Sequence, residues 1–190
     1  FPAPVEDTAA GLAFLEGGGL GAAIEPARLV VAGDSAGAQT VLALLQARRD
    51  AGLPKVGAGL LFYGCLAPDF DTESHRAFGG DERYLLSSER MRWYWSNHLA
   101  GRLDAPGPAA PLRADLRGLP PLFLDAASHD PLRDDTLRLA DRLAAIGAAH
   151  RLRVTPGVVH GYLRFAKRLP AAAETLAAAA AFLDETMAGP

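Results

Sequence analysis

One serine stands in a segment whose pattern is suited to nucleophilic catalysis. The apolar stretch Leu29–Ala32 ends abruptly at Gly-Asp-Ser-Ala-Gly, residues 33–37, and an amphipathic helical pattern begins at once. A strand, a sharp turn and a helix would strain the backbone of Ser35 and push its hydroxyl out of the sheet, and glycines at both ends of the turn avoid collisions. The helix start leaves unpaired N–H groups that can stabilise negative charge. In this context the pentapeptide predicts a catalytic serine.

An acid and a histidine follow at positions suited to activate that serine. A serine hydroxyl needs a base that removes its proton, and the base works best when a carboxylate orients it. Asp130 follows the apolar segment Pro121–Ala126, and His160 follows the segment Arg151–Thr155. Both lie beyond the carboxyl ends of predicted parallel strands, where active sites of open α/β sheets assemble. We therefore predict Ser35, Asp130 and His160 as the catalytic residues, in the order typical of α/β-hydrolases.

The other histidines are weaker candidates for the base. His129 adjoins Asp130 and cannot easily turn back onto it. The remaining three are expected to be exposed or to cap elements: His75, His98 and His150. No cluster of His, Cys, Asp and Glu has metal-ligand spacing, so we expect neither a metal nor another cofactor.

Strands and helices are predicted to alternate along the chain. Strands are expected at Arg28–Ala32, Val56–Tyr63, Pro121–Ala126 and Arg151–Thr155. Helices are expected near Val5–Leu12, at Ala36–Asp50, at Leu132–Ile146 and at the end, where Leu176, Ala180, Leu183 and Met187 would share one face. The alternation predicts an α/β fold with a mainly parallel sheet covered by helices on both faces.

Residues 66–119 interrupt this alternation, because they are too many for a single crossover. We interpret them as a cap insertion over one end of the sheet, within a single domain that comprises residues 1–190. A helix is expected around Ser87–Leu99, and it carries Trp93 and Trp95. We expect both tryptophans to bury the insertion against the main body. A role as a wall for substrate is the second possibility, and the two roles are compatible.

Composition narrows the possible partners. The chain has 190 residues, 49% of them hydrophobic, and a net charge of -3, which argues against binding to nucleic acid. Cys65 is alone, so no internal disulfide forms, and we expect a packed thiol and a cytoplasmic protein. No apolar run reaches membrane-spanning length. The expected partner is a small-molecule substrate.

Several motifs together resemble those of the hormone-sensitive lipase-like carboxylesterases. They are the serine pentapeptide, Asp-Pro-Leu-Arg-Asp at 130–134, His-Gly-Tyr at 160–162, and Gly-Leu-Pro-Pro at 118–121. The resemblance implies an α/β-hydrolase fold and cofactor-free hydrolysis of small to medium acyl esters, with the Ala36 N–H as one oxyanion donor. Tyr162 stands where phenylalanine is usual in that family. With Trp93 and Trp95, it is a candidate for contact with substrate.

The resemblance begins partway through that family's domain. The first strands and the His-Gly-Gly-Gly loop, which supplies further oxyanion donors, have no counterpart, and Gly17–Gly19 is expected to be a simple connector. Because Phe1 is no translation start, we expect a portion of a longer enzyme. A complete protein would instead expose the edge of the strand at Arg28–Ala32, a route to a homodimer. A non-catalytic hydrolase-like ligand-binding module, and a peptidase or amidase, remain alternatives.

Overall fold

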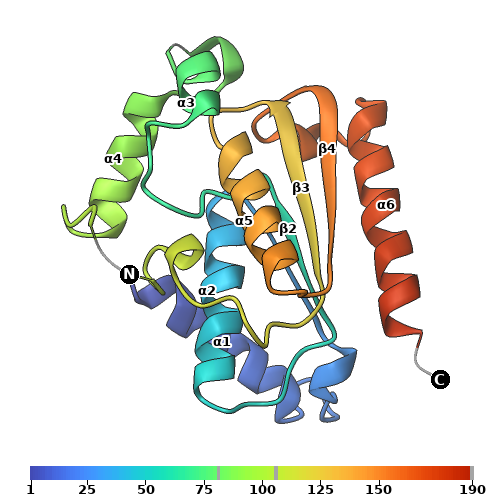
Figure 1. Cartoon of the computed structure of the whole chain (residues 1–190). Helices are drawn as coiled ribbons and strands as arrows, with labels where there is room; N and C mark the ends of the chain where they lie inside the picture. Colours follow the sequence, from blue (N-terminus) through green and yellow to red (C-terminus); the bar gives the residue numbers. More distant parts are fainter. Residues whose placement is uncertain (81, 105–106, 189–190) are drawn as a thin grey trace.

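A four-stranded sheet lies at the centre of the part of the chain that the computed structural model describes, residues 1–80, 82–104 and 107–188. The strands are β1 (Val30–Asp34), β2 (Ala58–Phe62), β3 (Leu122–His129) and β4 (His150–Val159). They are all parallel and lie in the order β1-β2-β3-β4 (Figure 1). The four predicted strands are confirmed. β3 and β4 extend beyond their predicted ends, toward the loops that carry Asp130 and His160.

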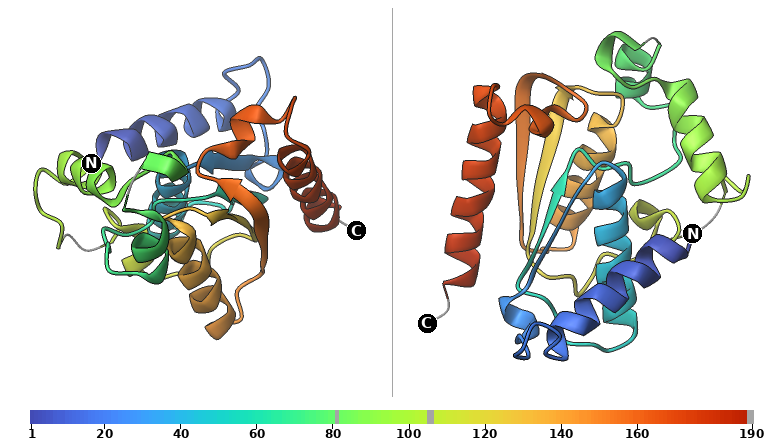
Figure 2. Two further views of the ribbon diagram at one scale, coloured as in Figure 1. Left: turned by 90° about the horizontal axis from the view of Figure 1, so that it is seen from above. Right: turned by 180° about the vertical axis from the view of Figure 1, so that it is seen from behind.

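Helices cover both faces of the sheet, as predicted. One face carries α1 (Ala3–Glu16), α2 (Ala36–Asp50) and α5 (Arg133–Ala145), and the other carries α6 (Pro170–Met187). Figure 2 shows α6 standing apart from the other three, with the sheet between them. The bounds of α2 agree with the prediction at both ends, because the strained turn fixes its start and Gly52 follows its end at a positive φ of 66°.

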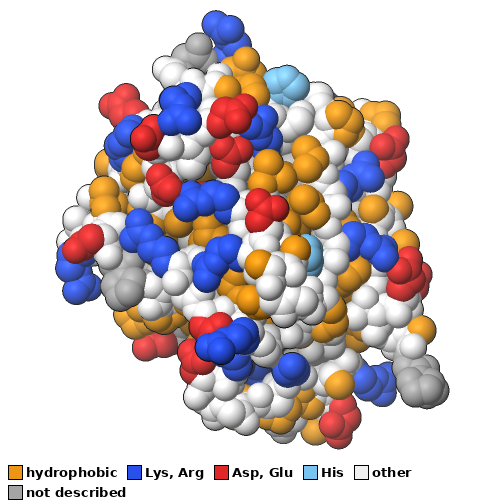
Figure 3. Space-filling view, viewed as in Figure 1, with side chains coloured by type: hydrophobic (Ala, Val, Ile, Leu, Met, Phe, Trp, Pro, Cys, Tyr) orange, Lys and Arg blue, Asp and Glu red, His pale blue; other side chains and the backbone are white. Residues whose placement is uncertain are grey.

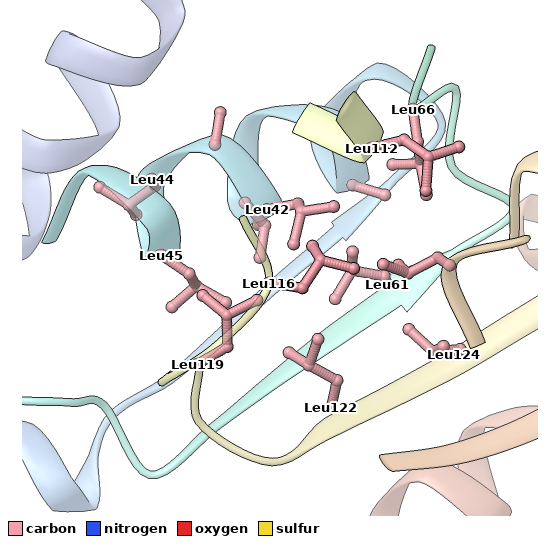
Figure 4. Close-up of a cluster of buried hydrophobic side chains, with 14 of the residues drawn as sticks. Leu42, Leu44, Leu45, Leu61, Leu66, Leu112, Leu116, Leu119, Leu122 and Leu124 are labelled. Carbon is pink, nitrogen blue, oxygen red and sulfur yellow. The ribbon is translucent and has the colours of Figure 1, made fainter. Parts of the chain in front are cut away.

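Alternating side chains of the central strands fill two apolar layers. Leu61, Leu122 and Leu124 pack toward α2 and α5, where leucines of α2 meet them (Figure 4). Phe62 and Phe123 point to the opposite layer, beneath α6. Each strand residue thus contributes to one layer or the other, as expected for a sheet buried on both faces. The loops at the carboxyl ends of the strands therefore start from a sheet that is packed on both faces.

The predicted inner face of the last helix is correct in part: Leu183 packs against the core and Met187 is half-buried, whereas the other two residues point outward. Leu176 is 44% exposed and Ala180 is also exposed. The buried positions are Ala172, Thr175, Ala179 and Phe182. The Phe182 ring lies 5.8 Å from that of Phe123, so the aromatic contact sets the rotation of the helix. In an alanine-rich helix the large aliphatic residues were a poor guide, because every side offers some apolar surface.

The segment interpreted as an insertion contains α3 (Glu73–Phe78) and α4 (Ser88–His98), which lie beside the carboxyl end of the sheet (Figure 1). Trp95 is buried in a cluster with Met91 and other apolar residues, as expected. Trp93 is 63% exposed, which corrects the expectation that it is buried. Two residues along a helix correspond to about 200°, so Trp93 and Trp95 lie on opposite sides.

His75 differs from its predicted exposure. It is buried in α3, its Nδ1 lies 2.8 Å from the Ser88 hydroxyl oxygen, and its ring contacts Phe70. Burial lowers the pKa of His75, and the nearby Arg92 adds to that effect. This histidine joins α3 to α4 and belongs to the packing of the segment.

Two acids of α5 hold the start of this segment. Asp135 is buried, and its Oδ2 accepts the N–H groups of Leu66 and Ala67 at 2.7 and 3.2 Å. Asp134 accepts the N–H of Ser74 at 2.8 Å. Burial raises the pKa of Asp135 to about 7 although the two N–H donors oppose the shift. The chain after β2 is therefore fixed to the helix that follows Asp130.

The surface in Figure 3 carries basic and acidic side chains interspersed with apolar ones. Neither sign of charge dominates this face. Within the described ranges, none of the helices is long and apolar enough to cross a membrane.

Candidate active site

The turn between β1 and α2 strains the backbone at Ser35. Ser35 has φ 54° and ψ -117°, a conformation that side-chain-bearing residues rarely adopt. A Cβ on Gly33 would lie 2.3 Å from the carbonyl carbon and oxygen of Gly37, so only glycine permits this close approach of strand and helix. Gly37 differs from Gly33: apart from its chain neighbours and the adjacent backbone of α2, no atom of the described residues lies within 4 Å of a Cβ placed there.

Gly33 and Gly37 provide a matched pair of substitutions. We expect Gly33→Ala to lower the free energy of unfolding by about 1–3 kcal/mol, because the new methyl group forces the backbone apart. Gly37→Ala should leave stability unchanged or raise it by up to about 1 kcal/mol, because alanine favours a helix over glycine. Chemical denaturation measures both. Equal stabilities for the two variants would contradict the packing described for the turn.

Ser35, His160 and Asp130 form one chain of hydrogen bonds. The Ser35 Oγ lies 2.9 Å from His160 Nε2, and His160 Nδ1 lies 2.8 Å from Asp130 Oδ2. A carboxylate only accepts, so Nδ1 carries the ring proton and Nε2 is left to accept from the serine hydroxyl. The other oxygen of Asp130 accepts the Leu132 N–H at 2.9 Å, and Asp130 is fully buried. This arrangement can transfer the serine proton to the imidazole.

A cleft of about 530 Å³ opens over Ser35 and His160. The other residues that line it are Ala36, Cys65, Leu85, Leu86, Arg90, Met91, Tyr94, Arg164 and Phe165. Ala36 is the first residue of α2, and its N–H is among those that a helix start leaves without a partner inside the helix. This N–H lies at the cleft beside Ser35 and can donate to a negatively charged oxygen there. Burial raises the pKa of Cys65 to about 12, so this thiol is neutral.

Tyr63 contacts His160, and the sequence analysis did not predict it as a site residue. It follows β2, has a positive φ of 38° and is buried. Its ring lies edge-to-face with that of His160 at 5.2 Å, and its hydroxyl donates to Asp34 Oδ2 at 3.2 Å. Burial and then the Asp34 charge raise the pKa of Tyr63. Tyr63 thus joins the serine turn to the histidine loop.

Tyr162 lies behind the cleft. It is buried, and its hydroxyl donates to Asp125 at 2.7 Å and lies 3.1 and 2.8 Å from the hydroxyl oxygens of Thr155 and Thr175. Burial raises the pKa of Asp125, and the hydroxyls of Thr155 and Tyr162 oppose that shift. The structure does not bring Tyr162 to the cleft lining, because this polar cluster holds its hydroxyl beneath α6. The cluster supports the histidine loop from below.

The two tryptophans are also separated from Ser35. Trp95 lines a smaller side pocket of about 170 Å³ that shares Ala36, Cys65, Met91 and Tyr94 with the cleft. Trp93 lines a different surface hollow, with Ser87 and Glu89 among its neighbours. Contact between Trp95 and a substrate group in the side pocket stays a prediction. Over the described residues, no group of three or more His, Cys, Asp or Glu side chains is placed to hold a metal ion.

The chain is similar in sequence to known α/β-hydrolases. The model of a family described as the alpha/beta hydrolase fold matches residues 1–164. Carboxylesterase NlhH of Mycobacterium tuberculosis is 36% identical over 178 residues, which are 92% of this chain and 56% of NlhH. Esterase LipI of the same organism is 35% identical over 181 residues, 92% of this chain and 55% of LipI. The chain spans a little over half the length of these relatives.

Solved structures show the same likeness. An esterase from the bacterial hormone-sensitive lipase family superposes with a TM-score of 0.86 at 32% identity, covering 98% of this chain and 61% of that one. Esterase LipW from Mycobacterium marinum gives a TM-score of 0.89 at 28% identity, covering 100% of this chain and 59% of that one. The structural similarity therefore extends over 98–100% of this chain, and the sequence similarity to the two curated relatives over 92% of it.

Proposed function

Because this chain belongs to the α/β-hydrolase fold family, among its hormone-sensitive lipase-like carboxylesterases, we propose that it hydrolyses carboxylic esters through an acyl-serine intermediate. The observation that carries the proposal is the continuous hydrogen-bond chain from Ser35 through His160 to buried Asp130. The names of the relatives support the ester as the bond attacked.

The first half of the reaction forms the acyl-enzyme. His160 Nε2 takes the proton of Ser35 as Oγ attacks the ester carbonyl carbon and the carbonyl electrons move onto oxygen. The Ala36 N–H donates to that oxyanion. The tetrahedral intermediate then collapses: the bond to the alcohol oxygen breaks, and His160 gives its proton to the departing alcohol. Asp130 stabilises the imidazolium between these two transfers without taking its proton.

The second half returns the serine. His160 Nε2 takes a proton from water, and the hydroxide oxygen attacks the acyl carbon. The bond to Ser35 Oγ breaks, Oγ recovers the proton from His160, and the carboxylic acid leaves. Each residue ends in its starting protonation state, so the cycle needs no cofactor.

Labelling with a fluorophosphonate tests the activated serine directly. We expect one adduct per molecule, located on Ser35 by peptide mass spectrometry, together with turnover of p-nitrophenyl butyrate. Ser96→Ala, which removes an exposed serine of α4, should label as the unaltered chain does. A folded protein that neither labels nor turns over ester would support a binding module instead. Faster cleavage of the matching anilide than of the ester would favour an amidase.

A further inference from the structure

The cleft over Ser35 has two chemically different ends. At one end Ala36, Cys65, Met91 and Tyr94 continue into the apolar side pocket beneath α4. At the other end are His160, Arg164 and Phe165, which belong to the loop after β4 and to the short helix η4 (Tyr162–Phe165). The side pocket contains none of these three residues.

The reaction assigns the two halves of an ester to these ends. The carbonyl oxygen must face the Ala36 N–H, and the alcohol oxygen must lie within reach of His160 Nε2, which protonates it. The acyl group then extends toward the side pocket, and the alcohol group extends past His160. Arg164 and Phe165 are therefore the neighbours of the leaving alcohol.

The Arg164 guanidinium is exposed but oriented. Its Nε donates to the Gly161 carbonyl at 3.2 Å. Gly161 has φ 73°, and a Cβ there would lie 2.3 Å from Arg164 Nη2, so the absence of a side chain lets the guanidinium pack over the residue next to His160. Among the described residues Arg164 forms no ion pair, and its terminal nitrogens have no carboxylate partner.

Arg164 is the cationic side chain at the His160 end of the cleft. Arg90 and Arg164 are the charged side chains on the cleft lining as described, and no carboxylate lies among those lining residues. The field of Arg164 reaches Tyr63, where it opposes the rise in pKa, and the ring of Tyr63 contacts His160. The acids nearby are Asp34, whose Oδ2 accepts from Tyr63, and buried Asp130, whose Oδ2 bonds to His160 Nδ1.

We propose that Arg164 binds a carboxylate on the alcohol portion of the substrate, so that the preferred esters have an anionic leaving alcohol. The proposal rests on the ester hydrolysis proposed above. A guanidinium presents a planar pair of donors that matches a carboxylate, and the apolar Phe165 beside it suits the body of the alcohol. Arg164 would thus determine specificity without taking part in proton transfer.

A pair of esters that differ in one charge tests this preference. In 3-butyryloxybenzoate and 3-butyryloxybenzamide, the butyryl group and the phenolic oxygen are the same, each has one ester bond, and only the first has a carboxylate. We expect Arg164→Gln to lower kcat/KM for the anionic ester about tenfold, mainly through KM, and to change that for the neutral ester less than twofold. Arg164→Lys should retain part of the preference. Arg168→Gln, an equal charge change at an exposed residue outside the cleft lining, should leave the ratio unaltered.

A binding measurement separates this proposal from the proposed function. Calorimetry with 3-hydroxybenzoate, the alcohol product, should show binding about tenfold weaker to R164Q than to the unaltered chain, while 3-hydroxybenzamide binds both equally. This readout requires no turnover, so it stands even if ester hydrolysis fails. Equal losses for the charged and neutral ligands, or no loss for either, would overturn the carboxylate site. Circular dichroism of R164Q establishes that the variant is folded.

Discussion

Replacing Ser35 with alanine is expected to lower kcat for p-nitrophenyl butyrate by about 10⁶-fold, since the variant has no atom that can form the acyl-enzyme. The change removes only Oγ, which bonds to His160 Nε2, so the fold should persist. Because ester binding uses the rest of the cleft, the Kd of a non-hydrolysed ester analogue should change little. Stopped assays over hours, with the enzyme concentration raised, measure the residual rate.

The control for Ser35→Ala is a substitution of a serine outside the cleft. Ser96→Ala provides it, because Ser96 is exposed on α4 and lies outside the cleft lining. Residual activity in the Ser35 variant at a hundredth of the original rate or more would exclude the acyl-serine route. That outcome would point to direct attack by water that His160 activates.

Asparagine in place of Asp130 is expected to lower kcat by about 10⁴-fold. The two side chains have nearly the same shape, and the carbonyl oxygen of the asparagine can still accept the Leu132 N–H, as the carboxylate does at 2.9 Å. The amide N–H₂ would, however, donate to His160 Nδ1, which then holds the opposite tautomer. The ring proton would sit on Nε2, and the histidine could not accept from Ser35. A pH profile of kcat/KM and a denaturation curve together separate lost catalysis from lost stability.

Asp134→Asn is the matched control for that substitution. Asp134 lies on the same segment and accepts the Ser74 N–H, yet its hydrogen bonds and ion pairs are with Ser74 and Arg133, and the partner of His160 is Asp130. We expect its activity to remain within a few-fold of the original, with some loss of stability. Comparable losses in both variants would mean that the segment acts through folding, and Asp130 would lose its orienting role.

The sequence predicted those parts of the fold that local chemistry determines. The turn at residues 33–37 required a strand before it and a helix after it, and both formed there. Apolar runs ending at Asp130 and His160 predicted that the two side chains would lie at one edge of a parallel sheet. The structure joins them to each other and to Ser35 through hydrogen bonds of 2.8 and 2.9 Å.

Features that depend on packing between distant segments were missed. The orientation of α6 follows from a contact between Phe182 and Phe123, which are far apart along the chain. Tyr63, just after β2, has a positive φ and contacts His160. A tyrosine after a strand does not by itself predict that backbone conformation. Likewise, the position of Arg164 depends on space above Gly161. Periodicity contains none of this information, because it describes one element at a time.

The short segment from Asp130 to Asp135 performs two separate tasks. Its first acid forms a hydrogen bond with His160 Nδ1, and its last two accept backbone N–H groups of Leu66, Ala67 and Ser74. The segment that lines one side of the cleft and the hydrogen-bond chain of Ser35, His160 and Asp130 are therefore both attached to residues 130–135. Loop replacements after Ser74 should change access to the cleft while leaving the hydrogen bonds among Ser35, His160 and Asp130 intact. Replacements that include residues 66–74 should disturb both the cleft and these hydrogen bonds.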